Sequence, residues 1–211
     1  MGTYTKELQS TAKSMIQKGK GILAMDESNG TCNKRFDALG IPTTEVSRQT
    51  YRELILSTPG LSDYVSGPIL YDETIRQTTR DGVPFLKVIA DAGMIPGIKV
   101  DTGAKDFAGH PGEKVTEGLD GLRDRIAEYY KMGARFAKWR AVITIGDGIP
   151  SRACIEANAH GLARYAALCQ EGGLVPIVEP EVLIDGNHSL ERCYQVRSEE
   201  RRVGKECRSR W

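Results

Sequence analysis

The sequence predicts an α/β protein built around a parallel sheet, on two observations. Short apolar runs alternate along the chain with longer segments whose apolar residues recur at helical spacing. The short runs are apolar at successive positions, which is typical of strands buried on both faces. Such a sheet is either doubly wound or closed as a barrel, and periodicity alone leaves both architectures open.

Five strands are predicted, at residues 21–25, 67–71, 97–100, 136–143 and 174–178. The first ends abruptly in the polar residues 26–30, so this strand delivers polar groups to its end.

Helices are predicted between the strands. Leu8, Ala12, Met15 and Ile16 recur at helical spacing before Gly19, so the chain opens with a helix. Residues 45–56 and 117–132 are predicted helices, and Ser151 is the expected N-cap of another that ends before Gly172. Cys169 lies on the apolar face of that last helix, where it is expected to be a core residue.

Composition excludes several classes of protein. The 211 residues carry a formal net charge of +1 and are 40% hydrophobic, which is ordinary for a globular protein. No stretch approaches the ~20 apolar residues of a membrane span, and the N-terminus lacks the apolar core of a signal peptide. We therefore expect a cytoplasmic protein that binds neither nucleic acid nor membrane.

Cysteine and histidine usage argues against disulfides and metals. The five cysteines are odd in number, widely spaced and without a C-x-x-C pair, which predicts reduced thiols. The three histidines lack the spacing of a local metal site, so no metal or other cofactor is expected.

The C-terminal residues 197–211, RSEERRVGKECRSRW, differ abruptly from the rest. They hold six Lys or Arg and three Glu, so the remainder of the chain has a net charge of −2. The start of this segment resembles the in-frame translation of a sequencing adapter, AGATCGGAAGAG. We therefore expect one partial domain over residues 1–196 and a non-native or disordered tail over 197–211. A solvated basic tail or a small nucleic-acid patch are the alternatives.

Charged residues on four predicted strands are the strongest functional signal. Burying a charge is costly, so each needs a partner or a wet cavity. Residues two apart in a strand share a face, so three cations and four carboxylates are expected to converge. They are Asp26, Lys99, Asp101, Lys138, Arg140, Glu179 and Glu181.

This set suits an anionic, carbonyl-bearing metabolite. A lysine beside Phe136 and Trp139 among other cations is expected to have a lowered pKa, which favours nucleophilicity or proton transfer. Neighbouring carboxylates can act as general acid and base, while Arg140 and Lys99 can grip a phosphate or carboxylate. A purely structural ion network is the alternative for any one pair.

The motifs GILAMDESNGTCNKRF, GIKVDTG, GLDGL, FAKWR and IVEPEV resemble those of class I fructose-bisphosphate aldolases. The resemblance covers essentially all of residues 1–196. It implies a (β/α)8 TIM barrel, truncated here after about the fifth strand. It also implies reversible cleavage of fructose 1,6-bisphosphate to dihydroxyacetone phosphate and glyceraldehyde 3-phosphate in glycolysis and gluconeogenesis, through a lysine Schiff base and without metal.

The resemblance also assigns roles to individual residues. Asp26 resembles the carboxylate that assists carbon–carbon bond chemistry, Glu179 the acid/base at the iminium, and Glu181 its close partner. Lys138 resembles the lysine that positions substrate and balances these carboxylates. The substrate-binding residues implied are Thr31, Lys99, Arg140 and, in the loop after the first strand, Arg35.

The Schiff-base lysine of the family lies on a strand later than Glu181, beyond the strands present here. We therefore expect the chain as written to be inactive and prone to aggregation, because a barrel needs eight strands to eliminate its edges. The intact relative is expected to be a homo-oligomer, a tetramer in the family. The alternatives are a noncatalytic module that binds sugar phosphates or pairs with full-length subunits, and, on weaker grounds, a zinc-dependent aldolase.

Overall fold

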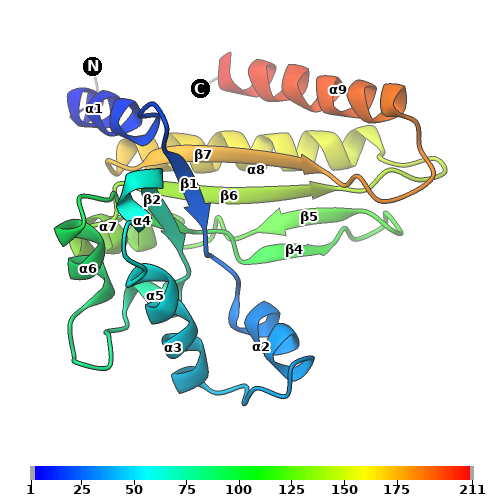
Figure 1. Ribbon diagram of the computed structural model, residues 1–211. Helices are drawn as coiled ribbons and strands as arrows, with labels where there is room; N and C mark the ends of the chain where they lie inside the picture. Colours follow the sequence, from blue (N-terminus) through cyan, green and yellow to red (C-terminus); the bar gives the residue numbers. More distant parts are fainter. Residues whose placement is uncertain (1–2, 210–211) are drawn as a thin grey trace.

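Five parallel strands, hydrogen-bonded in the order β1-β2-β3-β6-β7, form the centre of the computed structural model (Figure 1). The structure describes residues 3–209, and side chains are described through residue 199. The strands are β1 (Gly21–Ala24), β2 (Val65–Leu70), β3 (Gly97–Lys99), β6 (Phe136–Ile143) and β7 (Val175–Val182). They are neighbours in the order in which the chain forms them. A doubly wound sheet reverses its strand order at a switch point, so this order matches the wall of a barrel instead.

Helices and one hairpin connect the strands. The antiparallel hairpin consists of β4 (Gly103–Asp106) and β5 (Lys114–Glu117). The helices are α1 (Thr5–Met15), α2 (Asn29–Asp37), α3 (Glu45–Leu56), α4 (Leu61–Tyr64), α5 (Asp72–Ile75), α6 (Phe85–Asp91), α7 (Leu122–Met132), α8 (Arg152–Glu171) and α9 (Leu190–Ser209). Helix α8 runs behind β6 and β7, and α9 lies along α8 (Figure 1).

The two faces of the sheet carry different cores. The face toward the helices is the larger, with Leu70, Ile98 and Trp139 packed among residues of α6, α7 and α8. The opposite face, here called the inner face, holds a small cluster that includes Ile69 and Phe136. Side chains alternate along each strand, so neighbouring residues such as Ile69 and Leu70 enter different cores.

Glycine makes room on the inner face at the amino ends of the strands. A Cβ on Gly97 would lie 2.2 Å from the ring of Phe136, and a Cβ on Gly67 would lie 2.3 Å from the carbonyl oxygen of Ile95. Only glycine admits such contacts. The Phe136 ring therefore fills the space on the inner face that these glycines leave open at the amino ends of the strands.

Most predicted elements form where the sequence places them. Residues 45–56 and 136–143 match α3 and β6 residue for residue. Ser151 caps α8 by accepting a hydrogen bond from the Cys154 amide at 3.2 Å, and Cys169 is fully buried. Both predictions are confirmed. Cys32, Cys154, Cys169 and Cys193 are free thiols.

Several boundaries differ from the prediction. The helix predicted from residue 117 begins at Leu122, because Gly118 and Gly121 adopt positive φ angles of 127° and 64° after the unpredicted strand β5. Strand β7 continues past residue 178 to Val182. It lies at the edge of the sheet, where Pro180, paired with Ala141, is tolerated because its missing N–H is not needed by a further strand.

Two further expectations were wrong. Strand β1 is not buried on both faces, since Gly21 and Ala24 are exposed and Ile22 and Leu23 are half-buried; it lies at the edge of the five-stranded sheet and pairs with β2. The loop after β1, in which Arg35 was predicted, ends at Ser28, which accepts a hydrogen bond from the Thr31 amide at 3.3 Å and caps α2, so that Arg35 lies on a helix.

The C-terminal segment has a helical backbone through residue 209, as part of α9. Residues 210–211 of the predicted tail lie outside the described residues. The non-native origin of residues 197–211 stays a prediction.

Candidate active site

Lys138 is the centre of a buried ion cluster on the inner face. Its ammonium lies 3.1 Å from Asp26 Oδ2 and 2.8 Å from Glu179 Oε2, joining β6 to the end of β1 and to β7. The side chains of Lys138 and Asp26 are 9% and 11% exposed, whereas that of Glu179 is 36% exposed. This Lys138 cluster is thus buried on the β1 side and open to solvent on the β7 side.

The charge of Lys138 is stabilised rather than weakened. Burial by itself would lower the pKa of Lys138, but the hydrogen bond to Glu179 and the charges of Asp26 and Glu179 outweigh burial and raise it above its ordinary value. The lowered pKa predicted for this lysine was therefore wrong, because carboxylates and not cations surround it. Lys138 is an ammonium group near neutral pH.

Two residues farther along the same strands, Arg140 of β6 pairs with Glu181 of β7. The hydrogen bond from Arg140 lowers the pKa of Glu181 despite partial burial, and the pair raises the pKa of Arg140. Both side chains are about one-third to two-fifths exposed, at 42% for Arg140 and 35% for Glu181. This guanidinium is therefore accessible to an anionic ligand.

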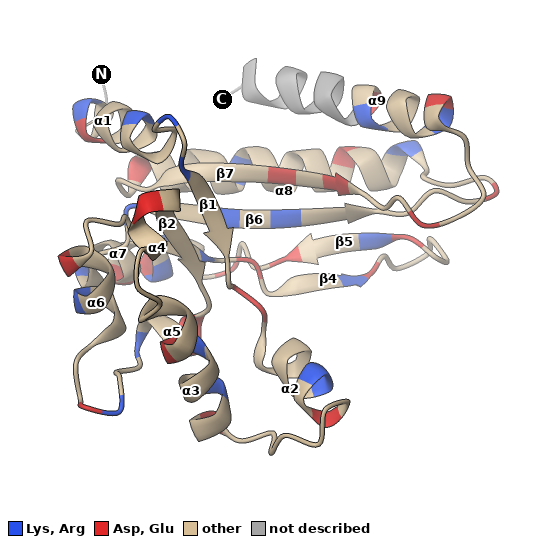
Figure 2. Ribbon diagram, viewed as in Figure 1, with Lys and Arg blue, Asp and Glu red and all other residues tan. Residues whose placement is uncertain are grey.

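Asp101 connects β3 to β6. One carboxylate oxygen accepts a hydrogen bond from the backbone amide of Arg140 at 3.2 Å. Strand β3 has ended at Lys99, so this side-chain oxygen takes the place of a backbone carbonyl of β3. The other accepts from the Gly103 amide at 3.1 Å and lies 3.7 Å from Lys99 Nζ. Asp101 therefore links the Lys99 side chain to the backbone of Arg140. Basic and acidic residues lie side by side on β6 and β7 (Figure 2).

The hairpin β4–β5 supports this arrangement from beside β6. Thr116 Oγ1 donates to the Arg140 carbonyl at 2.8 Å, and the Asn158 side chain of α8 accepts from the Thr116 amide at 3.2 Å. Arg125 of α7 donates to the carbonyl oxygens of Val100 and Gly118 at 2.9 and 2.5 Å. These contacts fix the backbone on both sides of Lys99 and Asp101.

Glu27 forms a second ion cluster, on the opposite side of the chain from Asp26. Its carboxylate binds Arg52, lies 2.5 Å from Arg35 and accepts from the Tyr51 hydroxyl at 3.2 Å. Arg52 also donates to the Glu27 carbonyl at 2.8 Å. Burial alone would raise the pKa of Glu27, but Arg52 and Arg35 lower it. This Glu27 cluster ties α2 and α3 to the residue next to Asp26.

The predicted site residues thus fall into two groups. The first group lies past the carboxyl end of β1, at that of β3 and within β6 and β7, and consists of Asp26, Lys99, Lys138, Arg140, Glu179 and Glu181. Arg35 and Thr31 lie on α2 instead, Arg35 paired with Glu27 and Thr31 bonded to Ser28. Arg35 is therefore on a helix, not in the loop predicted.

Sequence reasoning missed the residues that support the site. Arg48 and Arg52 are buried in α3 together with Leu56, at a spacing of four residues. That spacing was a signal, because arginines in line with an apolar stripe face the interior. Arg48 binds both oxygens of Glu73 at 2.7 Å, and Asn29 donates to Glu73 at 3.0 Å.

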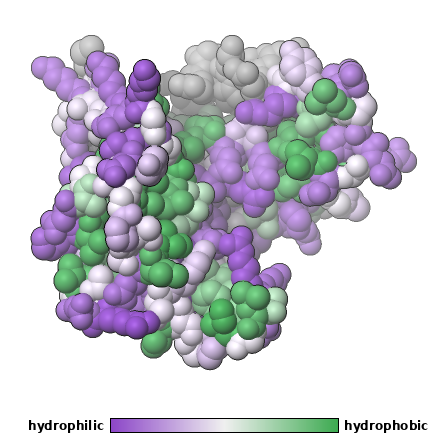
Figure 3. Space-filling model, viewed as in Figure 1, coloured by the Kyte–Doolittle hydropathy of each residue, from purple (hydrophilic) through white to green (hydrophobic). Residues whose placement is uncertain are grey.

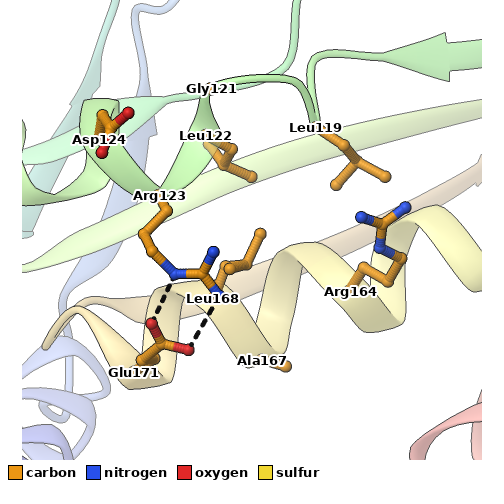
Figure 4. Close-up of a pocket in the computed structure, with 9 residues that line it drawn as sticks. All are labelled: Leu119, Gly121, Leu122, Arg123, Asp124, Arg164, Ala167, Leu168 and Glu171. Carbon is orange, nitrogen blue, oxygen red and sulfur yellow. Dashed lines mark hydrogen bonds and ion pairs between the residues drawn. The ribbon is translucent and has the colours of Figure 1, made fainter.

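The surface over the sheet is divided (Figure 3). Hydrophobic surface gathers on the side of β1 and β2, hydrophilic surface lies over the middle of β6 and β7, and a further hydrophobic group lies toward the ends of these two strands. A separate cavity of about 520 Å³ lies between α7 and α8, bordered by the ion pair of Arg123 with Glu171 and by Arg164 (Figure 4). None of the predicted site residues lines that cavity.

No helix within residues 3–209 is long and apolar enough to cross a membrane.

Comparison with protein families gives a match over residues 7–203 to the family described as fructose-bisphosphate aldolase class-I. A protein of Xanthomonas campestris, named a probable fructose-bisphosphate aldolase class 1, is 67% identical over 191 residues, which are 90% of this chain and 57% of the relative. An Arabidopsis thaliana protein named cytosolic is 55% identical over 196 residues, 93% of this chain and 55% of the relative. A second Arabidopsis thaliana protein, named chloroplastic, is 55% identical over 195 residues, which are 92% of this chain and 50% of the relative.

Among solved structures, fructose-bisphosphate aldolase from Plasmodium falciparum, described in complex with TRAP and a small molecule inhibitor, superimposes with a TM-score of 0.93. It is 47% identical, and the match covers 96% of this chain and 59% of that chain. The chain thus spans about half the length of the curated relatives it matches.

Proposed function

The chain belongs to the class I fructose-bisphosphate aldolase family, and from this premise we propose that the protein catalyses the reversible cleavage of fructose 1,6-bisphosphate into dihydroxyacetone phosphate and glyceraldehyde 3-phosphate. The reaction belongs to glycolysis and gluconeogenesis. It proceeds through a lysine Schiff base and without a metal. The five-stranded wall is then part of a (β/α)8 barrel, and the Schiff-base lysine lies on a strand later than β7.

The single observation that supports the proposal is that Lys138 lies within ion-pair distance of both Asp26 and Glu179, level with the carboxyl ends of β1 and β3 although β6 and β7 continue beyond it. Chemistry in barrels of this kind is carried by groups at those ends, contributed by several strands. An ion network with a merely structural role needs no such position. The Lys138 cluster is therefore the proposed catalytic centre.

The cations bind the substrate in this mechanism. Lys99 and Arg140 offset the charge of phosphate or hold substrate oxygens, Arg140 by sharing its guanidinium between Glu181 and the ligand. Arg35 and Thr31 on α2 bind phosphate once Arg35 is released, fully or in part, from Glu27.

The carboxylates move protons. Glu179, on the open side of the Lys138 cluster, acts as acid and base during formation and hydrolysis of the iminium, with Glu181 as its partner. Asp26 assists the breaking and making of the carbon–carbon bond. Because Lys138 remains charged, it positions substrate and balances these carboxylates, and it is not the amine nucleophile.

We further propose that the complete protein is cytoplasmic and forms a homo-oligomer, a tetramer as in the family. The C-terminal residues 197–211 are proposed to be foreign to it.

The test begins with long-read sequencing of the gene across the codon after Val196, so that the protein made is the one the gene encodes. That protein is assayed for cleavage of fructose 1,6-bisphosphate with a coupled dehydrogenase. It is then treated with dihydroxyacetone phosphate and borohydride, which reduces a substrate iminium to a stable amine. We expect turnover that exhaustive chelation leaves unchanged, and a covalent adduct on one lysine detected by mass spectrometry.

Turnover that chelation abolishes would contradict the Schiff-base mechanism. A genome that encodes Arg197 to Trp211 followed by a stop codon, with no turnover by the product, would favour the noncatalytic module.

A further inference from the structure

Strand β2 is the one strand of the five-stranded sheet for which the sequence predicted no site residue. Ile69 of β2 pairs with Ala24 of β1 and with Gly97 of β3, and Lys99 pairs with Lys138 of β6. Continued two residues past Ala24 and Ile69, where β1 and β2 end, the same register aligns Asp26 and Tyr71 with the paired residues Lys99 and Lys138. Tyr71 therefore stands in the row that holds the proposed catalytic centre.

The side chain of Tyr71 shares a face with these residues. Ile69 packs with Phe136 on the inner face, whereas Leu70 belongs to the core under the helices. Tyr71 follows β2 in an extended conformation, with φ −94° and ψ 160°, so continued alternation is expected to direct its side chain to the side of Ile69 and Lys99.

Tyr71 contacts Lys99 directly. The ammonium of Lys99 lies 5.8 Å from the centroid of the Tyr71 ring, within the range of a cation–π interaction. Tyr71, Lys99, Asp101 and Thr102 line a cavity of about 360 Å³ together with Asp72 and Arg76 at α5 and with Arg125, Glu128 and Tyr129 of α7. The ring thus limits the positions open to the Lys99 side chain, which Asp101 holds from its other side at 3.7 Å.

The hydroxyl group of Tyr71 is available to a ligand. It has no hydrogen-bond partner among the described residues, in contrast to the hydroxyls of Tyr51, Tyr129 and Tyr130, each of which binds a carboxylate. Burial, with the charges of Asp72, Glu73 and Asp101, raises the pKa of Tyr71 above its ordinary value. The group is therefore a neutral donor at physiological pH, suited to an anionic oxygen.

We propose that Tyr71 is a substrate-binding residue: its hydroxyl donates a hydrogen bond to an anionic oxygen of the phosphorylated ketose, and its ring positions Lys99 for the same ligand. This inference rests on the proposed function. Tyr71 thereby gives β2 a part in the site alongside the other four strands.

The test uses the full-length protein encoded by the gene, with three variants. Tyr71→Phe removes the hydroxyl and keeps the ring, and Tyr71→Leu removes both. Tyr64→Phe is the matched control, because Tyr64 is 74% exposed at the end of α4, away from this row. The values of kcat and KM for fructose 1,6-bisphosphate are measured for each protein.

We expect Tyr71→Phe to raise KM about tenfold and to leave kcat within about twofold, as for loss of one hydrogen bond to a charged group. Tyr71→Leu is expected to raise KM further, because Lys99 loses its ring contact. Tyr64→Phe is expected to match the wild type.

An active wild type with an unchanged KM in Tyr71→Phe would overturn the assignment of Tyr71 alone. A fall in kcat at unchanged KM would overturn it as well, because it would show that Tyr71 supports the chemistry or the fold and not binding. An inactive wild type that also fails to bind the bisphosphate in a calorimetric titration would overturn both the proposed function and this inference.

Discussion

Asp26 and Glu27 are neighbours in the chain, yet they enter ion clusters of opposite composition. In the Lys138 cluster one lysine lies between two carboxylates. In the Glu27 cluster one carboxylate lies between two arginines. The first therefore has a net negative charge and the second a net positive charge. Asp26 reaches Lys138 of β6, whereas Glu27 reaches Arg35 of α2 and Arg52 of α3.

The difference separates a site for chemistry from an anchor. Lysine is a compact charge whose neighbours can exchange protons, and Glu179 is open to solvent at the edge of the cluster. Arginine keeps its proton and offers a rigid fork, with which Arg52 holds both the carboxylate and the carbonyl oxygen of Glu27. The Glu27 cluster therefore holds in place the backbone from which Asp26 reaches Lys138.

Substitution of the central lysine is expected to have the largest effect. Lys138→Met leaves Asp26 and Glu179 close together without a cation. We expect kcat of the full-length protein to fall by at least about 100-fold, and the free energy of unfolding to fall by up to about 3 kcal/mol, at the lower end for buried pairs because Glu179 is partly exposed. Steady-state kinetics and urea denaturation measure the two effects.

The control for Lys138→Met is Lys131→Met, which changes an exposed lysine in the last turn of α7. Equal activity in the two variants would remove Lys138 from the proposed mechanism.

Substitution of the anchoring arginine is expected to act on stability first. Arg52→Met removes the buried guanidinium from the carboxylate and the backbone carbonyl of Glu27, while Arg35 and Tyr51 still donate to the carboxylate; we expect a cost of about 2–4 kcal/mol in the free energy of unfolding. Arg52→Lys is expected to recover less than half of that loss, because an ammonium lacks the fork that reaches both oxygens.

Arg123→Met is the matched control for Arg52, since Arg123 pairs with Glu171 on the surface between α7 and α8 (Figure 4). Exposed pairs contribute little, so its denaturation midpoint is expected to equal that of the wild type. If Arg52→Met were no more destabilising than Arg123→Met, the Glu27 cluster would not be an anchor.

The two clusters are expected to respond to opposite ends of the pH range. The pKa of Glu27 is lowered in the folded state, so its contribution is complete above the ordinary value of 4.5 and disappears as pH falls through the lowered value. The stability difference between wild type and Glu27→Gln should therefore be constant from pH 7 to about 5 and shrink below pH 4.5. Urea denaturation at successive pH values measures it.

The Lys138 cluster should behave in the reverse way. The pKa of Lys138 is raised, so its contribution is complete below 10.5 and is lost only as pH rises through the raised value. A difference between wild type and Lys138→Met that diminished between pH 7 and 9 would contradict the raised pKa.

The contrast between the clusters also explains how much of the site could be predicted from the sequence. Lys138, Arg140, Glu179 and Glu181 interrupt apolar strands, and their spacing of two residues predicts a shared face. Glu27 gave no comparable signal, because it follows the strand among other polar residues. The spacing of Arg52 with Leu56 was a weaker signal, because arginine on a helix is usually exposed. Strand order could not be predicted from periodicity either, because it depends on contacts between distant segments.

Tyr71 is a second residue whose place in the site could not be predicted from the sequence. An aromatic residue at the end of an apolar run is ordinary in a strand, so nothing in its composition distinguishes it. Tyr71 aligns with Asp26 and Lys99 only when the register between β1, β2 and β3 is known and is continued past the strand ends. Registers are fixed by pairing across the sheet and are not written in one segment of sequence.

The smallest expected effect tests whether charge or hydrogen bonding dominates the Glu27 cluster. Tyr51→Phe removes a neutral donor 3.2 Å from the Glu27 carboxylate, while Arg52 and Arg35 remain. The ring contact of Tyr51 with Phe36 also remains. We therefore expect a loss of about 0.5–1 kcal/mol in the free energy of unfolding, measured by urea denaturation. A loss as large as that from Arg52→Met would mean that the cluster depends on its full set of hydrogen bonds. The proposed distinction between a lysine cluster for chemistry and an arginine cluster for anchoring would then rest on geometry and no longer on charge.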